Sequence, residues 1–377
     1  MKKILFGITS LTLGGAERVL VDLSNALCDK YEITIFTIYA KGELEKQLNN
    51  KIKLKSLYDE AYLELSPLKR KFVVPLEVLL LKKKIYKKYI KDNYDVEIAF
   101  LEGPITRLFS INNKNTKKIA WIHNDITKVF GNGLKSKLKK ILDKRIYSKY
   151  DTIVFVSEDN LKKFNKEYKD IRNKYLEPIK KEVIYNYIDK ENIIKKAEEK
   201  NDDIVFNKDR INFVTVARLV EQKGIDRLIE IHSRLIKNGL KHNFYIIGDG
   251  PEKEKLEILI KKQKIEETFK LLGKKENPYP YIKKADYFCL LSRFEGYGMV
   301  LEEAKILDKP IIITDTAARE AVENYENARI FKNTEDGIYN GLENIILNNN
   351  KEKLKNDNKF EYDNKNIIEK IERLMEE

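Results

Sequence analysis

The chain has 377 residues, and its 42% of hydrophobic residues is enough to build the cores of two domains of ordinary size. No stretch of eighteen apolar residues occurs, which excludes a membrane-spanning helix. The net charge of +13 is confined to the front half: residues 1–190 hold 39 Lys or Arg against 24 Asp or Glu (+15), and the remainder holds 34 against 36 (−2). Nucleic acid, an anionic membrane surface or a polyanionic substrate each fits this excess, but no zinc spacing, RNA-binding motif or helix-turn-helix pattern favours nucleic acid.

The first residues superficially resemble a signal peptide, with two lysines followed by an apolar run at 4–13. The run is short, contains Ser and Thr, and leads to no small-residue cleavage site, so it is expected to be the first core strand. Both cysteines, Cys28 and Cys289, lie in apolar periodic segments. They are expected to be packed thiols in a reducing compartment.

Short apolar runs alternate with helical patterns along the whole chain. The predicted strands are residues 3–9, 33–39, 52–57, 96–101, 118–122, 152–157, 183–185, 211–217, 244–247, 269–272, 286–291, 310–314 and 328–331. This alternation predicts parallel sheets with right-handed crossovers, in two doubly wound α/β domains. The expected division is a first domain at 1–190, a linker at 191–210, a second domain at 211–360, and a C-terminal helix at 361–377 that packs back on the first domain.

Three features of the front half stand where predicted strands end, which is where open α/β sheets bind ligands. Gly14 and Gly15 follow the first strand, and there a phosphate approach and a plain tight turn fit equally well. His123 follows the fifth strand and is either structural or directed into a crevice between the domains. Ser157 follows the sixth strand and suits the cap of the next helix.

Two predicted helices of the front half, 79–91 and 134–149, interleave Leu, Ile and Tyr with clusters of Lys. Helices that lie on a membrane surface have this pattern. A solvated basic face above an ordinary core stripe has it too, and the sequence favours neither reading.

In the back half, Arg218 ends a strand and Lys223 follows in the next loop. Two cations at such a place suit a diphosphate, which Arg can bind with two parallel hydrogen bonds. Gly248 begins a tight Gly-Asp-Gly turn after the following strand. That turn is explained equally well by a structural role.

Residues 292–305 combine a strand-to-helix turn with two carboxylates. Gly296 and Gly298 let the backbone approach a ligand, and the start of the helix suits an anion. Glu295 and Glu303 can face the same crevice and accept hydrogen bonds from hydroxyl groups. The stretch therefore predicts a ligand that carries both phosphate and polyol groups, such as a nucleotide sugar.

In their order along the chain, these motifs resemble glycosyltransferase family 4, a family of retaining enzymes with two facing Rossmann-like domains, the GT-B fold. The resemblance runs from about residue 3 to residue 345. The matching residues are Gly14, Gly15, Ala16, Glu17, His123, Ser157, Asn186, Asp189, Arg218, Lys223, Gly248, Asp249, Gly250, Leu272, Gly273, Asn277, Pro278, Tyr279, Tyr281, Ile282, Lys283, Lys284, Ala285, Asp286, Glu295, Glu303 and Pro310.

The resemblance implies roles for these positions. Arg218 and Lys223 would hold the donor diphosphate, Glu303 the ribose hydroxyls and Glu295 the hydroxyls of the donor sugar, while His123 would lie beside the anomeric centre. His123 and Glu295 are thus the implied catalytic residues. The further donor-binding positions are Gly14, Gly15, Asn186, Gly248, Gly273, Lys274, Gly296, Tyr297 and Gly298, with the base pocket after Gly273. Neither a metal nor a cofactor is expected, because Arg218 and Lys223 would neutralise the diphosphate.

Two departures limit the resemblance. Residues 315–322 lack the glycine-rich turn that many relatives carry there, and the acceptor-facing loops at 41–75 and 125–135 match no interpretable pattern. The nucleotide site is therefore predicted more firmly than the sugar-specific pocket.

The function predicted is a retaining hexosyl- or N-acetylhexosaminyl-transferase for cell-surface polysaccharide synthesis. Its donor would be a nucleotide sugar, with UDP favoured because it is common in the family. Its acceptor would be a glycan or a polyprenyl-diphosphate sugar at the inner face of the cell membrane, which suits a cytoplasmic protein with a basic front half. The alternatives are a UDP-sugar epimerase, which needs more acid and base groups than His123, and a non-catalytic polyanion-binding protein.

Overall fold

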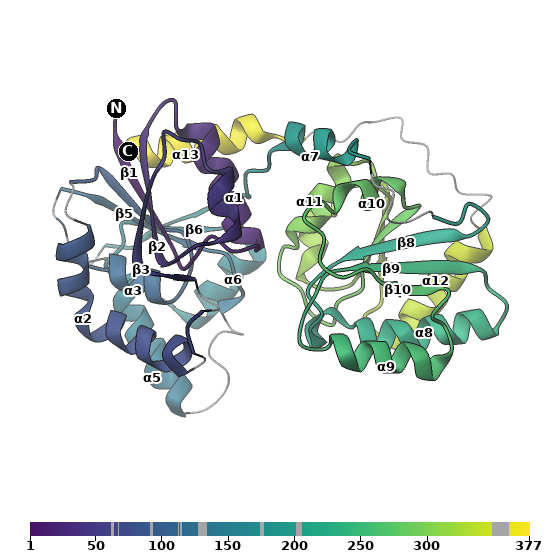
Figure 1. The fold of residues 1–377 in the computed structure, drawn as a ribbon. Coiled ribbons are helices and arrows are strands. Elements are labelled where there is room, and N and C mark those ends of the chain that lie inside the picture. The colour runs from purple at the N-terminus through teal and green to yellow at the C-terminus, as the bar shows by residue number, and fades with distance from the viewer. Residues whose placement is uncertain are drawn as a thin grey trace. The chain divides into compact units, whose positions relative to one another are not determined.

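The computed structural model describes residues 1–61, 64–66, 68–90, 93–111, 113, 115–126, 134–173, 177–200, 206–348 and 362–377. They form two compact units: unit 1 comprises Met1–Ile188 with Asp363–Glu377, and unit 2 comprises Asp189–Tyr362. Each unit holds one parallel sheet with helices on its faces (Figure 1). The prediction of two doubly wound parallel sheets is confirmed.

Unit 1 is built on a seven-stranded sheet in the order β3-β2-β1-β4-β5-β6-β7. Its elements are β1 (Lys3–Ile8), α1 (Gly15–Leu27), β2 (Glu32–Ala40), η1 (Glu43–Gln47), β3 (Lys53–Ala61), η2 (Lys69–Val73), α2 (Val74–Tyr89), β4 (Val96–Ala99), α3 (Pro104–Phe109), β5 (Lys117–Ile122), α5 (Leu134–Tyr147), β6 (Thr152–Phe155), α6 (Glu158–Glu167), β7 (Lys180–Val183) and α13 (Asn364–Glu376). The inner strands β1, β2, β4, β5 and β6 are mostly buried because helices cover both faces of the sheet. In β2, for example, seven consecutive residues are buried.

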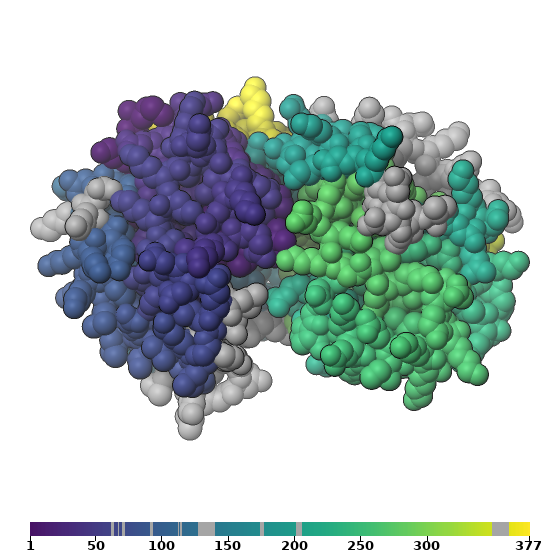
Figure 2. Space-filling view, viewed as in Figure 1, coloured from purple at the N-terminus to yellow at the C-terminus, as the bar shows by residue number. Residues whose placement is uncertain are grey.

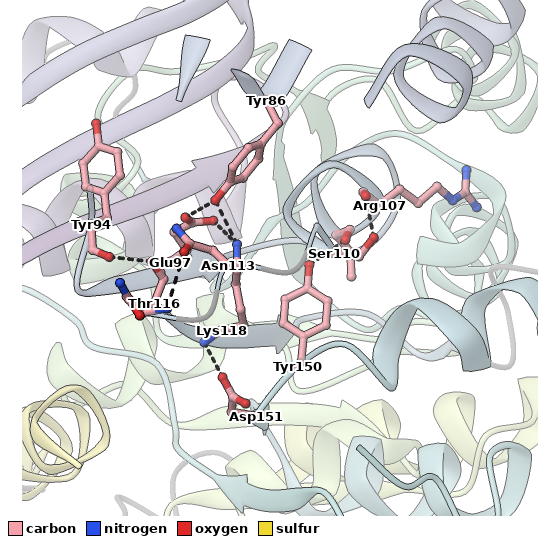
Figure 3. A network of polar contacts seen from close by, with 12 residues as sticks. Tyr86, Tyr94, Glu97, Arg107, Ser110, Asn113, Thr116, Lys118, Tyr150 and Asp151 are labelled. Atoms are coloured by element: carbon pink, nitrogen blue, oxygen red, sulfur yellow. Dashed lines mark hydrogen bonds and ion pairs between the residues drawn. The ribbon is translucent and has the colours of Figure 1, made fainter. Parts of the chain in front are cut away.

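Helices α2, α3, α5 and α6 contribute to one apolar core with the sheet of unit 1. Beneath α2 lies a polar contact that is almost without solvent exposure: Lys118 of β5 forms an ion pair with Glu97 of β4. The hydroxyl group of Tyr86, from α2, donates to the Glu97 carboxylate and accepts from Lys118 Nζ at 3.1 Å (Figure 3). Burial lowers the pKa of Lys118, and the charge of Glu97 opposes this shift. The network ties α2 to two neighbouring strands.

The C-terminal helix α13 and the final residue contact the amino ends of four strands of unit 1, β1, β2, β5 and β7. The Lys2 ammonium group donates to the carbonyl oxygens of Met375 and Glu376, and Lys117 Nζ donates to the Leu374 carbonyl at 2.6 Å. In Figure 2 the yellow atoms of α13 lie against the purple atoms of unit 1. Residues separated by more than 250 positions are thereby joined in one unit.

Unit 2 is built on a six-stranded sheet in the order β10-β9-β8-β11-β12-β13. Its elements are α7 (Lys190–Ala197), β8 (Ile211–Val216), η3 (Glu221–Lys223), α8 (Ile225–Lys237), β9 (His242–Ile247), α9 (Lys253–Gln263), β10 (Phe269–Leu271), α10 (Tyr279–Lys284), β11 (Tyr287–Leu290), α11 (Met299–Ile306), β12 (Ile311–Thr314), η4 (Ala317–Ala321), β13 (Ala328–Phe331) and α12 (Glu335–Asn348). Helices α8, α9 and α12 pack on one face, and α7, α10 and α11 lie together on the other (Figure 1).

The segment expected to be a linker, 191–210, differs from that expectation at its start. Helix α7 belongs to unit 2 and packs against α10 and α11. Asn277 Nδ2 donates to the Lys196 carbonyl at 2.8 Å, and Lys283 forms an ion pair with Glu198. Residues 201–205 of that segment, and 349–361 before α13, lie outside the described residues.

Candidate active site

The polar centre of unit 2 is an ion pair between two predicted site residues. Lys223 ends η3, after β8, and Glu295 lies in the turn between β11 and α11. Their side chains are joined by a salt bridge and are 17% and 10% exposed. Ser292 Oγ donates to Glu295 Oε2 at 3.0 Å, and Thr314 Oγ1, at the end of β12, donates to the Ser292 carbonyl at 2.6 Å. Loops from three strands thus fix the carboxylate of Glu295.

A second set of contacts holds this turn in place, and sequence reasoning missed it. Arg293 donates to the two carboxylate oxygens of Asp226, in α8, from its two terminal guanidinium nitrogens, at 2.6 and 2.8 Å. Burial acts to raise the pKa of Asp226, but the hydrogen bonds and charge of Arg293 outweigh burial and leave the pKa below its usual range. Asn333 Nδ2 donates to the Arg293 carbonyl at 2.8 Å. The turn that carries Glu295 is therefore anchored to α8 and to the loop between β13 and α12.

The predicted glycines that follow the strands of unit 2 differ in the space and the backbone angles around them. An ideal Cβ on Gly248 would lie 1.8 Å from the carbonyl oxygen of Ala217, and Gly248 has a φ of +149°. Its N–H donates to the Gly273 carbonyl at 2.9 Å, so the geometry gives Gly248 a packing role between the loops after β8, β9 and β10. A Cβ on Gly296, by contrast, would meet nothing within 4 Å. Gly298, at φ +73°, is the N-cap residue that precedes α11.

The remaining predicted donor-binding residues of unit 2 lie near the carboxyl ends of the same strands. Arg218 follows β8, its side chain is exposed, and no hydrogen bond or ion pair joins its guanidinium group to another described residue. Lys274 is exposed and follows Gly273 after β10. Glu303 lies one turn into α11, where the Tyr279 hydroxyl donates to its Oε1 at 3.4 Å. Because all six strands are parallel, their carboxyl ends bring these residues to one edge.

The buried face of α11 carries a second Lys–Glu pair that sequence reasoning also missed. Glu302 and Lys305 are joined at 2.7 Å, with side chains 1% and 7% exposed. Burial raises the pKa of Glu302, and the charge of Lys305 opposes this shift. Tyr297 donates to Glu302 Oε1 at 2.7 Å, and Lys305 Nζ donates to the Ala321 carbonyl at 2.6 Å. In the structure, therefore, Tyr297 serves to hold the turn beside Glu295.

In unit 1, His123 follows β5 and packs against aromatic rings. Its ring centroid lies 4.7 Å from that of Phe100 and 6.4 Å from that of Trp121. Among the described residues, its Nε2 atom has no hydrogen-bond partner. Burial lowers the pKa of His123 to about 3, so the imidazole is neutral at physiological pH. A neutral imidazole can donate or accept a hydrogen bond without carrying a charge.

The loop of His123 is supported by Glu102, which follows β4. The backbone N–H of Asn124 donates to Glu102 Oε1 at 2.7 Å, and Asn124 Nδ2 donates to Oε2 at 3.0 Å. Burial raises the pKa of Glu102, and these hydrogen bonds oppose the rise. Nothing in the sequence marked Glu102, because its partner is 22 positions away.

The other predicted residues of unit 1 lie in different loops. Gly14 and Gly15 begin α1 after β1, and no side chain caps that helix. Asn186 is buried in the segment after β7. Ser157 accepts a hydrogen bond from the Asn160 N–H at 3.1 Å, which confirms that it caps α6. The predicted acceptor loop 125–135 lies outside the described residues at 127–133.

The described residues contain no cluster of three or more His, Cys, Asp or Glu placed to hold a metal ion. Within the same residues, no helix combines the length and the apolar composition needed to cross a membrane.

Comparisons with known proteins agree with this architecture. Residues 196–374 match the family model described as "Glycosyl transferases group 1". The chain is 31% identical over 363 residues to the N-acetylgalactosamine-N,N'-diacetylbacillosaminyl-diphospho-undecaprenol 4-alpha-N-acetylgalactosaminyltransferase of Campylobacter jejuni, covering 92% of this chain and 90% of that protein. A second N-acetyl-D-galactosaminyltransferase of C. jejuni, whose name also specifies an undecaprenol-linked acceptor, is 28% identical over 92% of this chain and 86% of its own length.

Among solved structures, HepE of Anabaena, crystallised with UDP and glucose, superposes with a TM-score of 0.73 at 18% identity over the full length of both chains. That likeness establishes the shared GT-B fold. The extended match to the first Campylobacter enzyme, itself a glycosyltransferase, favours the predicted transferase over the epimerase and polyanion-binding alternatives. The chain belongs to the glycosyl transferases group 1 family and is a glycosyltransferase.

Proposed function

We propose that this protein is a retaining transferase that moves an N-acetylhexosamine from a UDP-linked donor to a sugar on a polyprenyl-diphosphate carrier. The observation that carries the donor site is the Lys223–Glu295 pair, together with the exposed Arg218 in the same segment after β8 as Lys223. The acceptor class follows from the Campylobacter relatives, whose names specify undecaprenol-linked acceptors and N-acetylgalactosaminyl transfer.

The donor diphosphate would bind to Lys223 and Arg218. An ammonium group has three N–H donors, so Lys223 can keep its contact with Glu295 while it donates to a phosphate oxygen. The Arg218 guanidinium can add two parallel hydrogen bonds to the same diphosphate. Two cations at the leaving group would stabilise the negative charge that develops on UDP as its bond to the sugar breaks.

The carboxylates would position the donor. Glu295, held by Ser292 and Lys223, would accept hydrogen bonds from sugar hydroxyls, and Glu303 would accept them from the ribose. In a same-face displacement, the acceptor oxygen forms its bond to the anomeric carbon on the face from which UDP leaves. The proton of the acceptor hydroxyl passes to the departing phosphate. His123 is proposed to contact the donor sugar as a neutral hydrogen-bonding group.

Calorimetric titration with UDP, GDP and ADP tests the donor site. Wild-type protein is expected to bind UDP with micromolar affinity, and Arg218→Ala and Glu303→Ala are each expected to weaken binding at least about tenfold, the loss of one good charged contact. Arg234→Ala and Glu257→Ala, at exposed positions of α8 and α9, are matched controls and should keep wild-type affinity. Tighter binding of GDP or ADP than of UDP would show that the donor carries a different base. If the folded protein binds none of the three nucleotides, the proposal is wrong.

Transfer itself is tested with UDP-N-acetylhexosamines and a short polyprenyl-diphosphate disaccharide. Nuclear magnetic resonance of the product gives the anomeric configuration. An α-linked product from an α-linked donor is expected, and a β-linked product would contradict the retaining mechanism.

A further inference from the structure

The outward face of η2 and α2 in unit 1 is unusually apolar for an exposed helix. Phe72, Leu76 and Leu80 are 64%, 54% and 69% exposed, and Leu79 is exposed as well. The next two turns of the same helix expose lysines instead. We name the whole set the α2 surface; it consists of Phe72, Leu76, Leu79, Leu80, Lys83, Lys84, Lys87 and Lys88. Scattered exposed apolar residues are normal, but a contiguous group of this kind marks an interaction site.

The α2 surface cannot become buried by rotation of the helix, because the opposite face of α2 packs into the core of unit 1. Val74, Val78 and Ile85 are buried there at helical spacing. Tyr86 is bound to the buried Glu97–Lys118 pair (Figure 3), and Lys82 Nζ donates to Ser110 Oγ at 3.2 Å. Packing and polar contacts therefore fix the rotation of α2 about its axis.

Along the helix, the α2 surface is divided into an apolar half and a basic half. Leu76, Leu80, Lys83 and Lys87 follow one another at intervals of three or four residues, so they share one face. Residues 69–88 contain eight Lys or Arg and a single acidic residue, Glu77, which accepts a hydrogen bond from Tyr58. In the part of the chain that is described, no carboxylate pairs with Lys83, Lys84 or Lys87.

Helix α5 adds residues of the same two kinds. Ile141 and Leu142 are 54% and 50% exposed, and Lys144 is exposed on the same helix. Lys149, just beyond α5, is close enough to affect Lys82: burial and then the charge of Lys149 lower the pKa of Lys82. The run of lysines in α2 therefore begins near a further positive charge, that of Lys149.

We propose that the α2 surface docks this protein on a lipid bilayer with anionic head groups. The acyl boundary would accept Phe72, Leu76, Leu79 and Leu80, and anionic head groups would pair with the lysines. A second copy of the chain fits less well, because the two α2 surfaces would meet each other in a two-fold interface and neither contains a carboxylate to pair with the lysines. The inference rests on the proposed function for its purpose, since a polyprenyl-linked acceptor lies in the membrane.

Sedimentation with lipid vesicles tests the proposal on the full chain. Wild-type protein is expected to bind vesicles of phosphatidylglycerol and phosphatidylcholine, and to bind pure phosphatidylcholine much more weakly. Lys83→Gln with Lys87→Gln should weaken binding roughly 25-fold, since about 1 kcal/mol per lysine corresponds to about fivefold. Leu76→Gln with Leu80→Gln should weaken binding at least about tenfold. All four positions are exposed and Gln has good helix propensity, so the variants should fold.

The matched control carries the same chemistry on α9 of unit 2. Ile258 is 67% exposed and Lys261 and Lys262 are exposed, so Ile258→Gln with Lys261→Gln and Lys262→Gln should bind vesicles like the wild type. Vesicle binding that is absent in the wild type, or unchanged in both α2 variants, overturns the proposal. A dimer in analytical ultracentrifugation that dissociates in Leu76→Gln with Leu80→Gln, without vesicle binding, overturns it in favour of a second copy.

Titration with UDP separates this test from that of the proposed function. None of the α2 substitutions lies in the donor site, so each variant should bind UDP like the wild type. Protein that binds UDP but not anionic vesicles overturns the docking proposal alone. Protein that binds vesicles but no nucleotide overturns the proposed function alone.

Discussion

The two units have the same doubly wound strand order around their first strands, but different contacts hold the loops at the carboxyl ends of their strands. In unit 2, polar side chains link the loops: Lys223 binds Glu295, Thr314 and Ser292 support it, and Arg293 clamps Asp226. In unit 1, His123 packs among aromatic rings and is supported through backbone contacts to Glu102. Charged and polar side chains therefore join the loops of unit 2, whereas unit 1 places a neutral, largely buried imidazole after β5.

A second comparison concerns the Lys–Glu pair that each unit buries. In unit 1 the Lys118–Glu97 pair lies under α2 and joins two strands, and in unit 2 the Lys305–Glu302 pair lies within α11 under the site. A buried ion pair is a poor source of net stability, but the loss of one partner leaves the other charge buried and uncompensated. Both pairs therefore act as positional constraints, one on the α2 surface and one on the turn of Glu295.

The largest predicted effect comes from breaking these pairs. Lys118→Met is expected to lower the free energy of unfolding of unit 1 by about 3–5 kcal/mol, because it leaves the buried Glu97 without its ion-pair partner. Urea denaturation followed by fluorescence of Trp121, the single tryptophan and a residue of β5, reports on this unit.

Two further variants sharpen that prediction. Lys305→Met should destabilise unit 2 by a similar amount while the Trp121 transition stays near its wild-type midpoint. Lys118→Met combined with Glu97→Leu should recover much of the lost stability, since apolar residues can replace a buried pair at little cost. A double variant no more stable than Lys118→Met would show that the uncompensated charge is not the cause.

The next largest effect is expected for a substitution of Gly248, which tests the packing role of this glycine in unit 2. Gly248→Ala places a Cβ 1.8 Å from the Ala217 carbonyl oxygen and forces Ala to adopt a φ of +149°, so unit 2 should lose about 3 kcal/mol or more. Gly296→Ala is the matched control: its Cβ has open space, and stability should change by less than about 0.5 kcal/mol. Circular dichroism during urea denaturation measures both. Equal stability of the two variants would contradict the packing role of Gly248.

Much of the fold was predictable because apolar strands that alternate with amphipathic helices permit few arrangements. The exception is β7, predicted at 183–185 and found at Lys180–Val183. This strand lies at the edge of the sheet and begins with two lysines, so its polar residues pair with β6 while the apolar Ile184 is buried beyond it. A run of apolar residues predicts which residues are buried. At the edge of a sheet, however, the residues that pair with the neighbouring strand need not be the buried ones.

The site was predictable only in part, for a related reason. Arg218, Lys223, Glu295 and Glu303 follow strands, and strand ends can be found from local pattern. Arg293 gave no local signal, because its function depends on Asp226, 67 positions earlier in the chain. The packing role of Gly248 likewise depends on a carbonyl group from another loop.

The smallest of the three effects is a pH dependence that belongs to unit 1. The pKa of His123 is about 3 in the folded protein, against an ordinary value near 6.5. The unfolded chain therefore binds a proton that the folded chain does not. The stability this contributes is fully present above pH 6.5 and is lost as pH falls toward 3. Between pH 6.5 and 5 the loss should reach roughly 2 kcal/mol, at 1.36 kcal/mol per pH unit.

His123→Phe removes the titrating group and keeps an aromatic ring beside Phe100. The urea midpoint of the Trp121 transition should then fall less steeply between pH 6.5 and 5 than in the wild type. His242→Phe is the appropriate control, because burial also lowers the pKa of His242, to about 4, but this residue lies in unit 2. It should leave the pH dependence of the Trp121 transition unchanged. If the slope is the same in His123→Phe as in the wild type, the imidazole is charged or exposed in the folded protein, and the contrast between a charged unit 2 edge and a neutral unit 1 edge does not hold.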